Sequence, residues 1–355
     1  NNLPKWIIDY GQKDIKDYLK SSNFFKKKLQ KLSIENDLFV LTNMNICLSA
    51  YIDTPHVAVL LGSDLYQYTN FDFYKEILKK HDKYWINGKK GSDYINHLHD
   101  MISRQITGIK SSILYSFNIK NLLPEGEKIL ENLDLTNERF DFYFGDNPIT
   151  KNNLEVKQKK SKFSILNGSR INFSNNNKFN LMDQKGTEFL IDAFYMFLKL
   201  GGKGNLILFE KGNDIDEAKK LISNYKINNN VIWLREKKLY DFYLEVLRAD
   251  IVVDNLVDNV PGRVTLDAMA MSKAVVCKIN QNPFIQNYNK KLPVIDFKNS
   301  TDLSKVLLKL SLNKKTLNKH SKQSFNFFKS HLSSEIQTNH FIKKLKFVSK
   351  QKNET

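Results

Sequence analysis

Short apolar runs alternate with longer amphipathic segments through the second half of the chain. The apolar runs predict buried strands at 163–167, 205–209, 230–234, 250–253 and 274–279. The segments between them predict helices at 185–200, 214–225, 239–248 and 263–272. Continuous apolar strands separated by helices are typical of a parallel sheet, because helices cover both of its faces. We therefore predict a doubly wound α/β domain here, with its ligand site at the carboxyl ends of the strands.

The first half shows the same alternation with less regularity. A charged helix is predicted over 12–34, and strands are predicted at 38–41, 57–61, 113–117 and 140–144. The resulting division places a Rossmann-like domain at 1–150, a Lys- and Asn-rich linker at 151–162, a second domain at 163–302 and a basic helical tail at 303–355. The last helix of the tail is expected over about 333–350.

Composition is that of a globular protein, with 41% hydrophobic and 12% aromatic residues. We see no apolar run near the ~18 residues that suggest a spanning helix, and no signal peptide. Cys47 and Cys277 lie far apart in apolar, strand-like runs. Buried reduced thiols are the expectation, and they fit a cytoplasmic protein.

Charge adds a second feature, because the formal net charge is +17 and it is unevenly distributed. Residues 1–150 hold 19 basic and 19 acidic side chains, whereas residues 151–355 hold 36 and 19. The stretch 305–355 alone carries 12 basic and 2 acidic residues. A basic tail can meet nucleic acid, an anionic membrane or an acidic substrate. A nucleic-acid-binding protein is one alternative, but the basic residues are scattered over helices and no nucleic-acid motif is present, so we expect no nucleic-acid partner.

Familiar nucleotide and metal signatures are absent from the sequence. There is no Walker lysine loop and no G-x-G-x-x-G after a first strand. A glycine-rich segment, Gly201-Gly202-Lys203-Gly204, follows a predicted helix and precedes a strand, so we expect it to end the helix. His97 and His99 have no ligand spacing around them, and Asp214 and Asp216 open a helix, where capping explains them. We therefore expect no cofactor and no metal at the site.

Candidate ligand-binding residues gather at the strand ends of the second half. Arg170 follows the strand at 163–167, Lys185-Gly186 opens the next helix, and Gly262 opens the helix that carries Asp267. In a doubly wound sheet these positions converge on one crevice. Two helix N-termini with a lysine and an arginine would bind a pyrophosphate, and Asp267 could accept hydrogen bonds from a ribose.

These residues carry a resemblance to a known family. The segment from Ile165 to Val276 resembles the C-terminal domain of GT-B glycosyltransferases, in the large retaining family 4 and its relatives. The matching motifs are Gly168-Ser169-Arg170, Lys185-Gly186-Thr187, Asn230-Val231-Ile232-Trp233-Leu234, Ala249-Asp250-Ile251-Val252-Val253-Asp254 and the run from Gly262 to Val276. The implied fold is α/β, with two doubly wound Rossmann-like domains facing a cleft and helices at the C-terminus.

The resemblance also implies an activity. It is transfer of a sugar from a nucleoside diphosphate sugar to a hydroxyl, with retention, in the synthesis of surface polysaccharide or glycoconjugate. Arg170 and Lys185 would hold the diphosphate leaving group, and Gly168 and Gly262 would let the backbone approach it. The implied donor contacts further along the chain are Leu234 and Arg235 at the nucleobase, Asp267 at the ribose and Asn259 at a sugar hydroxyl.

The N-terminal half resembles the partner, acceptor-side domain of such enzymes. Gly62-Ser63-Asp64-Leu65 is similar to a G-S-D-L turn that faces the interdomain cleft, and Asn147-Pro148-Ile149 is similar to a motif that closes the domain. Asp64 is accordingly a candidate catalytic residue on the acceptor side. The alternative for Asp64 is an N-cap on the segment that follows it.

Several positions depart from the family pattern. The usual two glutamates, eight positions apart, are replaced by Asn259 and Asp267, and Leu61 stands where relatives often have histidine. The chain begins at Asn1, and the first strand with its glycine-rich loop, expected before that residue, is missing. A GT-B sugar-nucleotide epimerase, or an inactive relative that binds sugar nucleotides, is therefore an alternative to a transferase.

The expected partners are a sugar nucleotide and a glycan or lipid-linked acceptor. Phe341, Ile342, Leu345 and Val348 share one face of the predicted last helix. Together with the basic charge around them, they suggest docking on an anionic membrane, which would make the protein peripheral at the inner face of the membrane. The alternative is a helix that packs on the protein and exposes a charged face to solvent.

Overall fold

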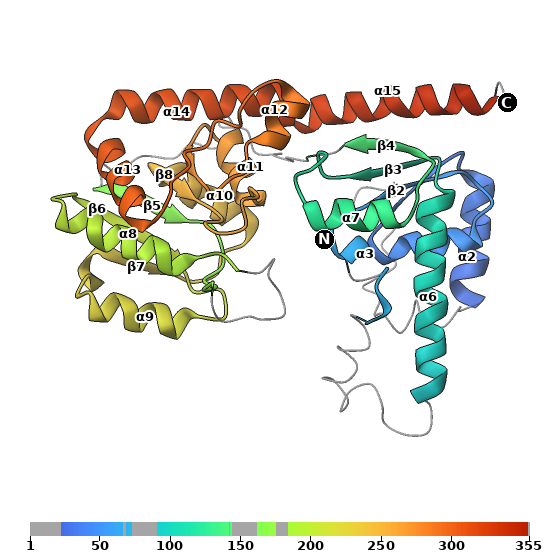
Figure 1. Cartoon of the computed structure of the whole chain (residues 1–355), viewed down its shortest axis with the longest axis horizontal. Coiled ribbons are helices and arrows are strands. Elements are labelled where there is room, and N and C mark those ends of the chain that lie inside the picture. The colour runs from blue at the N-terminus through green and yellow to red at the C-terminus, as the bar shows by residue number, and fades with distance from the viewer. Residues whose placement is uncertain are drawn as a thin grey trace. The chain divides into compact units, whose positions relative to one another are not determined.

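The chain folds into two compact α/β units (Figure 1). The computed structural model describes residues 23–66, 69–72, 91–141, 143, 162–174 and 184–353. One unit comprises Asn1–Phe142 and Phe341–Thr355, and the other comprises Tyr143–His340. The expected linker lies almost wholly outside the described residues, as do the motif Asn147-Pro148-Ile149 and the start of the first predicted helix.

The second unit is built on a five-stranded parallel sheet. Its strands are β5 (Phe163–Asn167), β6 (Gly204–Phe209), β7 (Val231–Leu234), β8 (Ile251–Val253) and β9 (Ala274–Val276), in the spatial order β7-β6-β5-β8-β9. The connecting helices are α8 (Thr187–Lys199), α9 (Ile215–Asn224), α10 (Leu239–Arg248) and α11 (Arg263–Ala270). The strands and helices predicted between 163 and 279 are all confirmed, with small shifts at their ends.

Buried apolar side chains on both faces of this sheet explain why its strands are continuous apolar runs. Ile165, Leu206 and Val253 have no exposed surface, and Phe194 and Phe197 of α8 pack in the same core. Gly201, with φ 89°, ends α8, and the N–H of Gly202 donates to the carbonyl oxygen of Phe197 at 2.9 Å. The glycine run at 201–204 is therefore the helix stop that its position predicted.

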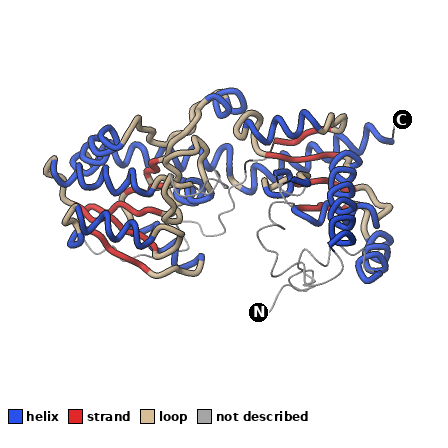
Figure 2. Tube along the Cα trace, turned by 60° about the horizontal axis from the view of Figure 1, so that its bottom comes forward, coloured by secondary structure: helices blue, strands red, loops and turns tan. Residues whose placement is uncertain are grey.

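The first unit holds a four-stranded parallel sheet in the order β1-β2-β3-β4. These strands are β1 (Phe39–Thr42), β2 (His56–Val59), β3 (Leu114–Phe117) and β4 (Glu138–Asp141), and the last begins two residues earlier than predicted. The helices are α2 (Asn23–Glu35), α3 (Ser63–Tyr66), α6 (Gly91–Ser111) and α7 (Pro124–Asn132), and the 3₁₀ segment η1 (Asn43–Tyr51) follows β1. Figure 2 shows the strands of each unit running side by side, with helices lying against them.

The C-terminal helices do not form a separate tail, which corrects the predicted organisation. Leu303 and Leu307 of α13 (Ser300–Leu312) are fully buried in the core of the second unit, and α14 (Lys314–Phe327) packs on β9. The short η5 (Phe328–Leu332) and α12 (Asn282–Tyr288) complete this unit. The charged residues of these helices lie on the sides that face solvent, while the opposite sides pack on the protein.

The last helix, α15 (Ser334–Asn353), begins in the second unit and ends in the first. The Phe341 ring lies 5.6 Å from that of Phe140, the Lys344 ammonium donates to Glu138 at 2.6 Å, and Val348 is 4% exposed. Most of the apolar face that was expected to meet a membrane is therefore covered by protein. Among the described residues, no helix is long and apolar enough to cross a bilayer.

Both cysteines are buried free thiols, as predicted. Burial raises the pKa of Cys47 to about 11 and raises that of Cys277 well above its usual value. Neither thiol is therefore ionised at neutral pH, and thiolate chemistry is not expected at either position.

Candidate functional site

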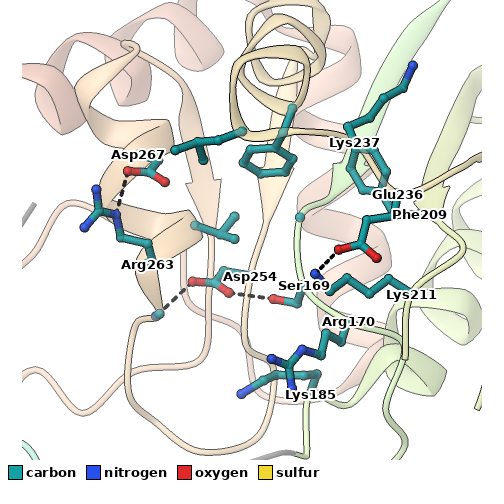
Figure 3. Close-up of a pocket in the computed structure, with 15 residues that line it drawn as sticks. Ser169, Arg170, Lys185, Phe209, Lys211, Glu236, Lys237, Asp254, Arg263 and Asp267 are labelled. Carbon is teal, nitrogen blue, oxygen red and sulfur yellow. Dashed lines mark hydrogen bonds and ion pairs between the residues drawn. The ribbon is translucent and has the colours of Figure 1, made fainter. Parts of the chain in front are cut away.

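The order of strands in the second sheet creates a crevice at one edge. From β5 the chain proceeds to β6 and β7 on one side and then returns to β8 and β9 on the other. The loops that follow β5 and β8 therefore leave in opposite directions, and this is where doubly wound sheets bind ligands. A cavity of about 600 Å³ opens at this point (Figure 3), a size that suits a small molecule.

The predicted strand-end residues meet in this cavity. Gly168, Arg170, Lys185, Gly262 and Asp267 all line it. Sequence reasoning missed the other lining residues, which are Ser169, Phe209, Lys211, Glu236, Lys237, Leu239, Phe242, Asp254, Arg263 and Val264. Five lining side chains are basic and three are acidic, so the pocket carries a surplus of positive charge. Such a surplus favours an anionic ligand.

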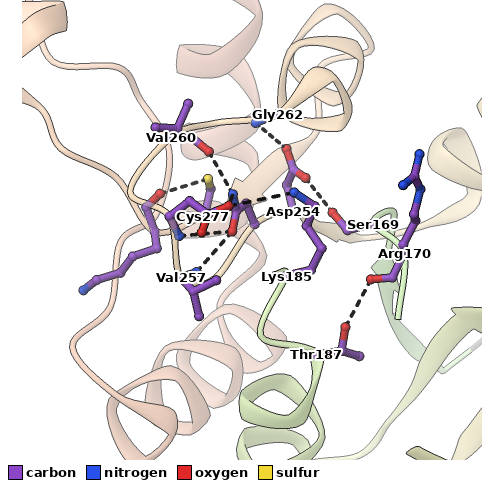
Figure 4. A network of polar contacts seen from close by, with 12 residues as sticks. Ser169, Arg170, Lys185, Thr187, Asp254, Val257, Val260, Gly262 and Cys277 are labelled. Carbon is purple, nitrogen blue, oxygen red and sulfur yellow. Dashed lines mark hydrogen bonds and ion pairs between the residues drawn. The ribbon is translucent and has the colours of Figure 1, made fainter. Parts of the chain in front are cut away.

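The buried carboxylate of Asp254, directly after β8, joins the two sides of the pocket. One oxygen accepts the Ser169 hydroxyl at 2.6 Å, and the other accepts the Gly262 N–H at 2.8 Å and the N–H and hydroxyl of Thr265 at 3.0 and 2.7 Å. Figure 4 shows Asp254 between Ser169 and Gly262. Asp254 thus caps the first turn of α11 and fixes the loop after β5 to it. A polar residue closing the apolar run at 250–253 was the signal for this role.

Two glycines let the backbone segments approach one another here. A Cβ at Gly168 would lie 2.3 Å from Val264 Cγ1, and one at Gly262 would lie 2.8 Å from Asp254 Oδ2. Neither distance is compatible with a side chain. The loop after β5 therefore reaches the N-terminus of α11 only because both positions are glycine.

Lys185 is held between two loops by its main chain. Its N–H and that of Gly186 both donate to the Asn172 carbonyl at 3.1 Å, and its own carbonyl accepts the Leu256 N–H at 3.1 Å. The ammonium lies 3.9 Å from a carboxylate oxygen of Asp258, beyond hydrogen-bond distance. Gly186, with φ 68°, forms the N-cap of α8, so Lys185 lies at a helix N-terminus as the sequence predicted.

Asp267 lies on the wall of the pocket, in the second turn of α11. Its side chain is 4% exposed, and its carboxylate accepts the Arg263 Nε–H at 2.9 Å. This pair, one helical turn apart, sets the position of the carboxylate. Arg263 is half-exposed and was not identified from the sequence.

Three of the residues predicted to contact the donor lie outside the lining of this pocket. Leu234 ends β7, the edge strand, and the loop that begins at Arg235 reaches the cavity through Glu236 and Lys237. The carboxylate of Glu236 is paired with the Lys211 ammonium. Asn259 adopts a left-handed conformation, with φ 56°, and lines a separate cavity of about 440 Å³ beside Phe297.

Asp64, predicted as a catalytic candidate, is fully buried in the first unit. Its carboxylate accepts the N–H groups of Leu61, Gly62 and Leu65, and that of Asn43 at 3.2 Å. Burial raises its pKa above the usual value, although these hydrogen bonds oppose the rise. Asp64 lies within α3 and holds the turn that precedes this helix, so it is not the N-cap of the following segment, and its carboxylate is not presented to a substrate.

Among the described residues, no group of three or more His, Cys, Asp and Glu side chains could hold a metal ion. The Asp214 carboxylate accepts the Phe173 N–H at 2.7 Å. Asp214 is the N-cap residue of α9, but its side chain makes no capping hydrogen bond and instead holds the loop after β5, which corrects the capping interpretation.

Comparison with known proteins adds a family and a fold. Residues 179–327 match the family model of the glycosyl transferases group 1. A search of curated protein sequences gave no match.

Similar solved structures include HepE of Anabaena in complex with UDP, at 14% identity and a TM-score of 0.61 over 90% of this chain and 81% of HepE. Sucrose-phosphate synthase of Thermosynechococcus elongatus is 12% identical, with a TM-score of 0.54 over 90% of this chain and 79% of the synthase. The pneumococcal O-GlcNAc transferase GtfA, in complex with UDP and GlcNAc, is 11% identical, with a TM-score of 0.56 over 92% of this chain and 60% of GtfA. These likenesses show that the predicted GT-B fold is correct.

Asp254 generates a prediction about stability. Asp254→Ala should lower the free energy of unfolding by about 2–4 kcal/mol, because it leaves several buried donors without an acceptor. Asp254→Asn should cost less, since the amide oxygen can keep the α11 donors and the amide nitrogen can donate to Ser169. Urea unfolding measures both changes.

Asp241→Ala serves as the matched control, because Asp241 is exposed in the first turn of α10. It should change stability by no more than about 0.5 kcal/mol. Equal effects of Asp254→Ala and Asp241→Ala would contradict the role of Asp254.

Proposed function

We propose that the chain moves a sugar from a nucleoside diphosphate sugar to a hydroxyl acceptor with retention, in line with the match of residues 179–327 to the glycosyl transferases group 1. One observation carries the proposal. Arg170, Lys185 and the N-termini of α8 and α11 converge on a single pocket at the strand-order switch. Cations and helix N-termini together are a suitable site for a diphosphate.

The charge that develops during transfer gives these groups their role. As the anomeric bond breaks, negative charge grows on the departing diphosphate, and a group that binds this charge lowers the barrier more than it stabilises the ground state. Arg170 and Lys185 act in this way, without a divalent metal. Lys185 is suited to the task because it lines the pocket directly before the N-terminus of α8.

Asp267 positions the donor rather than reacting with it. Its carboxylate lies at the pocket wall and accepts from Arg263, so a ribose hydroxyl would meet an acceptor whose orientation is already set. The nucleobase would lie toward the loop after β7, beside Phe209, Phe242 and Lys237, which line the same pocket. Aromatic and apolar side chains at that end suit a flat heterocycle.

The acceptor is a glycan or a lipid-linked glycan in surface polysaccharide or glycoconjugate synthesis, in the cytoplasm. The function is tested by incubating the protein with a panel of nucleoside diphosphate sugars and following release of nucleoside diphosphate with and without an acceptor. Acceptor-dependent release that EDTA does not reduce supports transfer without a metal. An interconverted donor sugar would indicate an epimerase, and no turnover of any donor would indicate an inactive relative.

The diphosphate role predicts the effect of two substitutions. Arg170→Ala and Lys185→Ala should each lower kcat by ~10²–10³, by analogy with removing one preorganised electrostatic donor. Binding of the free nucleoside diphosphate, measured by calorimetry, should weaken as well. The fold should survive, since Arg170 is exposed and the Lys185 side chain is 22% exposed.

Lys199→Ala is the matched control for this experiment. Lys199 lies in the last turn of α8, away from the helix N-terminus, and its ammonium stacks over the Tyr195 ring. The control should keep wild-type activity. Equal losses in Lys185→Ala and Lys199→Ala, or no loss in either, would place the donor site elsewhere.

We further propose that the outer face of α15 docks on an anionic membrane. Phe341 and Val348 are covered, but Ile342 and Phe347 remain 42% and 51% exposed, with exposed Lys343 and Lys346 on the same face. Apolar side chains flanked by lysines suit the interface of a bilayer. Each lysine near such a surface adds ~1 kcal/mol.

Vesicle sedimentation tests this docking surface. The chain should bind vesicles that contain phosphatidylglycerol but not vesicles of phosphatidylcholine alone, and Lys343→Glu with Lys346→Glu should weaken binding about tenfold or more. The matched control reverses Lys314 and Lys315, two exposed lysines of α14. Indifference to anionic lipid, or equal weakening in the control, would rule the surface out.

A further inference from the structure

A single peptide unit at the mouth of the donor pocket is fixed at both of its ends. The Tyr143 hydroxyl donates to the Pro261 carbonyl oxygen at 2.6 Å. The N–H of the next residue, Gly262, donates to the Asp254 carboxylate at 2.8 Å. The carbonyl and the N–H belong to one planar group, so neither can turn without breaking the bond of the other. The peptide between Pro261 and Gly262 is therefore held in one orientation.

Neighbouring contacts extend this restraint along the loop. The carbonyl of Val260 accepts from the Asn255 side-chain amide at 3.4 Å, and the Asn255 oxygen accepts the Val257 N–H at 3.1 Å (Figure 4). Side chains thus bind the backbone at three successive points from Val260 to Gly262. These bonds set the path by which the loop after β8 enters α11.

The Tyr143 ring is itself immobilised by aromatic packing. Tyr143 is 6% exposed and meets Phe284 edge to face, with ring centroids 5.7 Å apart. Phe284 contacts Tyr288, and Tyr288 meets Phe327 of α14 at 5.7 Å. Burial raises the pKa of Tyr143 well above its usual value, so the hydroxyl stays protonated and remains a donor. Its position is thus determined by the core of the second unit.

The orientation of this peptide matters because Gly262 is the N-cap of α11. The first turn of α11 contributes Gly262, Arg263 and Val264 to the pocket. Backbone N–H groups stabilise developing charge only when they already point at it, because reorienting them during the reaction costs free energy. A peptide fixed from both ends keeps this turn directed into the pocket.

We propose that Tyr143 is a positioning residue of the donor pocket, which it serves by holding the peptide between Pro261 and Gly262. Tyr143 does not line the pocket and acts through α11 rather than by contact with the donor. The inference rests on the proposed glycosyl transfer. If so, removing the Tyr143 hydroxyl, which lies outside the pocket, reduces stabilisation of the transition state more than it reduces binding of the donor.

Tyr143→Phe tests the proposal, because it removes the hydroxyl and keeps the ring. The Pro261 carbonyl, which is buried, then loses its partner, and the peptide can rotate. We expect kcat to fall about tenfold, which corresponds to about 1.4 kcal/mol, while the donor KM changes by less than about threefold. Hydrogen exchange measured on a peptide covering 258–266 should become faster, because the Gly262 and Thr265 amides lose their fixed geometry.

Tyr225→Phe is the matched control, since its hydroxyl donates to Asp192 at 2.7 Å in the same unit and it does not line the pocket. It should leave kcat and the exchange of 258–266 unchanged. Unchanged exchange in Tyr143→Phe, wild-type kcat in that variant, or equal changes in both variants would overturn the proposal. A wild-type protein without transfer activity would instead refute the proposed function, and the exchange contrast would still decide whether Tyr143 holds the peptide.

Discussion

The donor pocket depends on one buried carboxylate, that of Asp254. Burying an isolated charge costs several kcal/mol, so a carboxylate with 3% exposure persists only where donors surround it. Here the hydroxyls of Ser169 and Thr265 and the N–H groups of Gly262 and Thr265 supply them, and the N-terminus of α11 adds a favourable dipole. Satisfying this charge forces the loop after β5 and the first turn of α11 together, and their junction is one wall of the pocket.

The distribution of charge within the pocket follows from the same logic. Lys211 is paired with Glu236 and Arg263 with Asp267, so much of the positive charge is already engaged within the protein. The Lys185 ammonium lies 3.9 Å from a carboxylate oxygen of Asp258, which does not line the cavity. An entering diphosphate meets Lys185 and Arg170 together with the paired cations, and charge-assisted hydrogen bonds to such groups are strong. The two ion pairs set the positions of the side chains on the walls of the pocket.

The sequence predicted the helices and strands, which follow from local periodicity, and the pocket residues that lie next to the ends of strands. The strands of the second sheet could be predicted because both faces of the sheet are buried. The pocket residues that could be predicted adjoin those strands or lie near the starts of helices, namely Arg170, Lys185, Gly262 and Asp267. Loop residues were less predictable. Asn259 lines another cavity and has a φ of 56°, a left-handed conformation that the spacing of motifs does not reveal. For Asp64, the sequence pattern could not show that the carboxylate is buried and accepts N–H groups from the turn before α3.

The C-terminal helix shows the same limit for an amphipathic pattern. Periodicity shows that α15 has an apolar face, but it cannot say whether protein or lipid covers that face. In the structure Phe341 packs against Phe140 and Val348 is buried, so the largest apolar contribution to membrane binding is already used in folding. Two apolar side chains, Ile342 and Phe347, remain exposed among lysines. The attraction between such lysines and anionic headgroups decays over a Debye length of about 8 Å at physiological salt. Docking by this face would therefore be reversible and would weaken as salt is raised, in contrast to the stable anchoring that an exposed apolar helix would give.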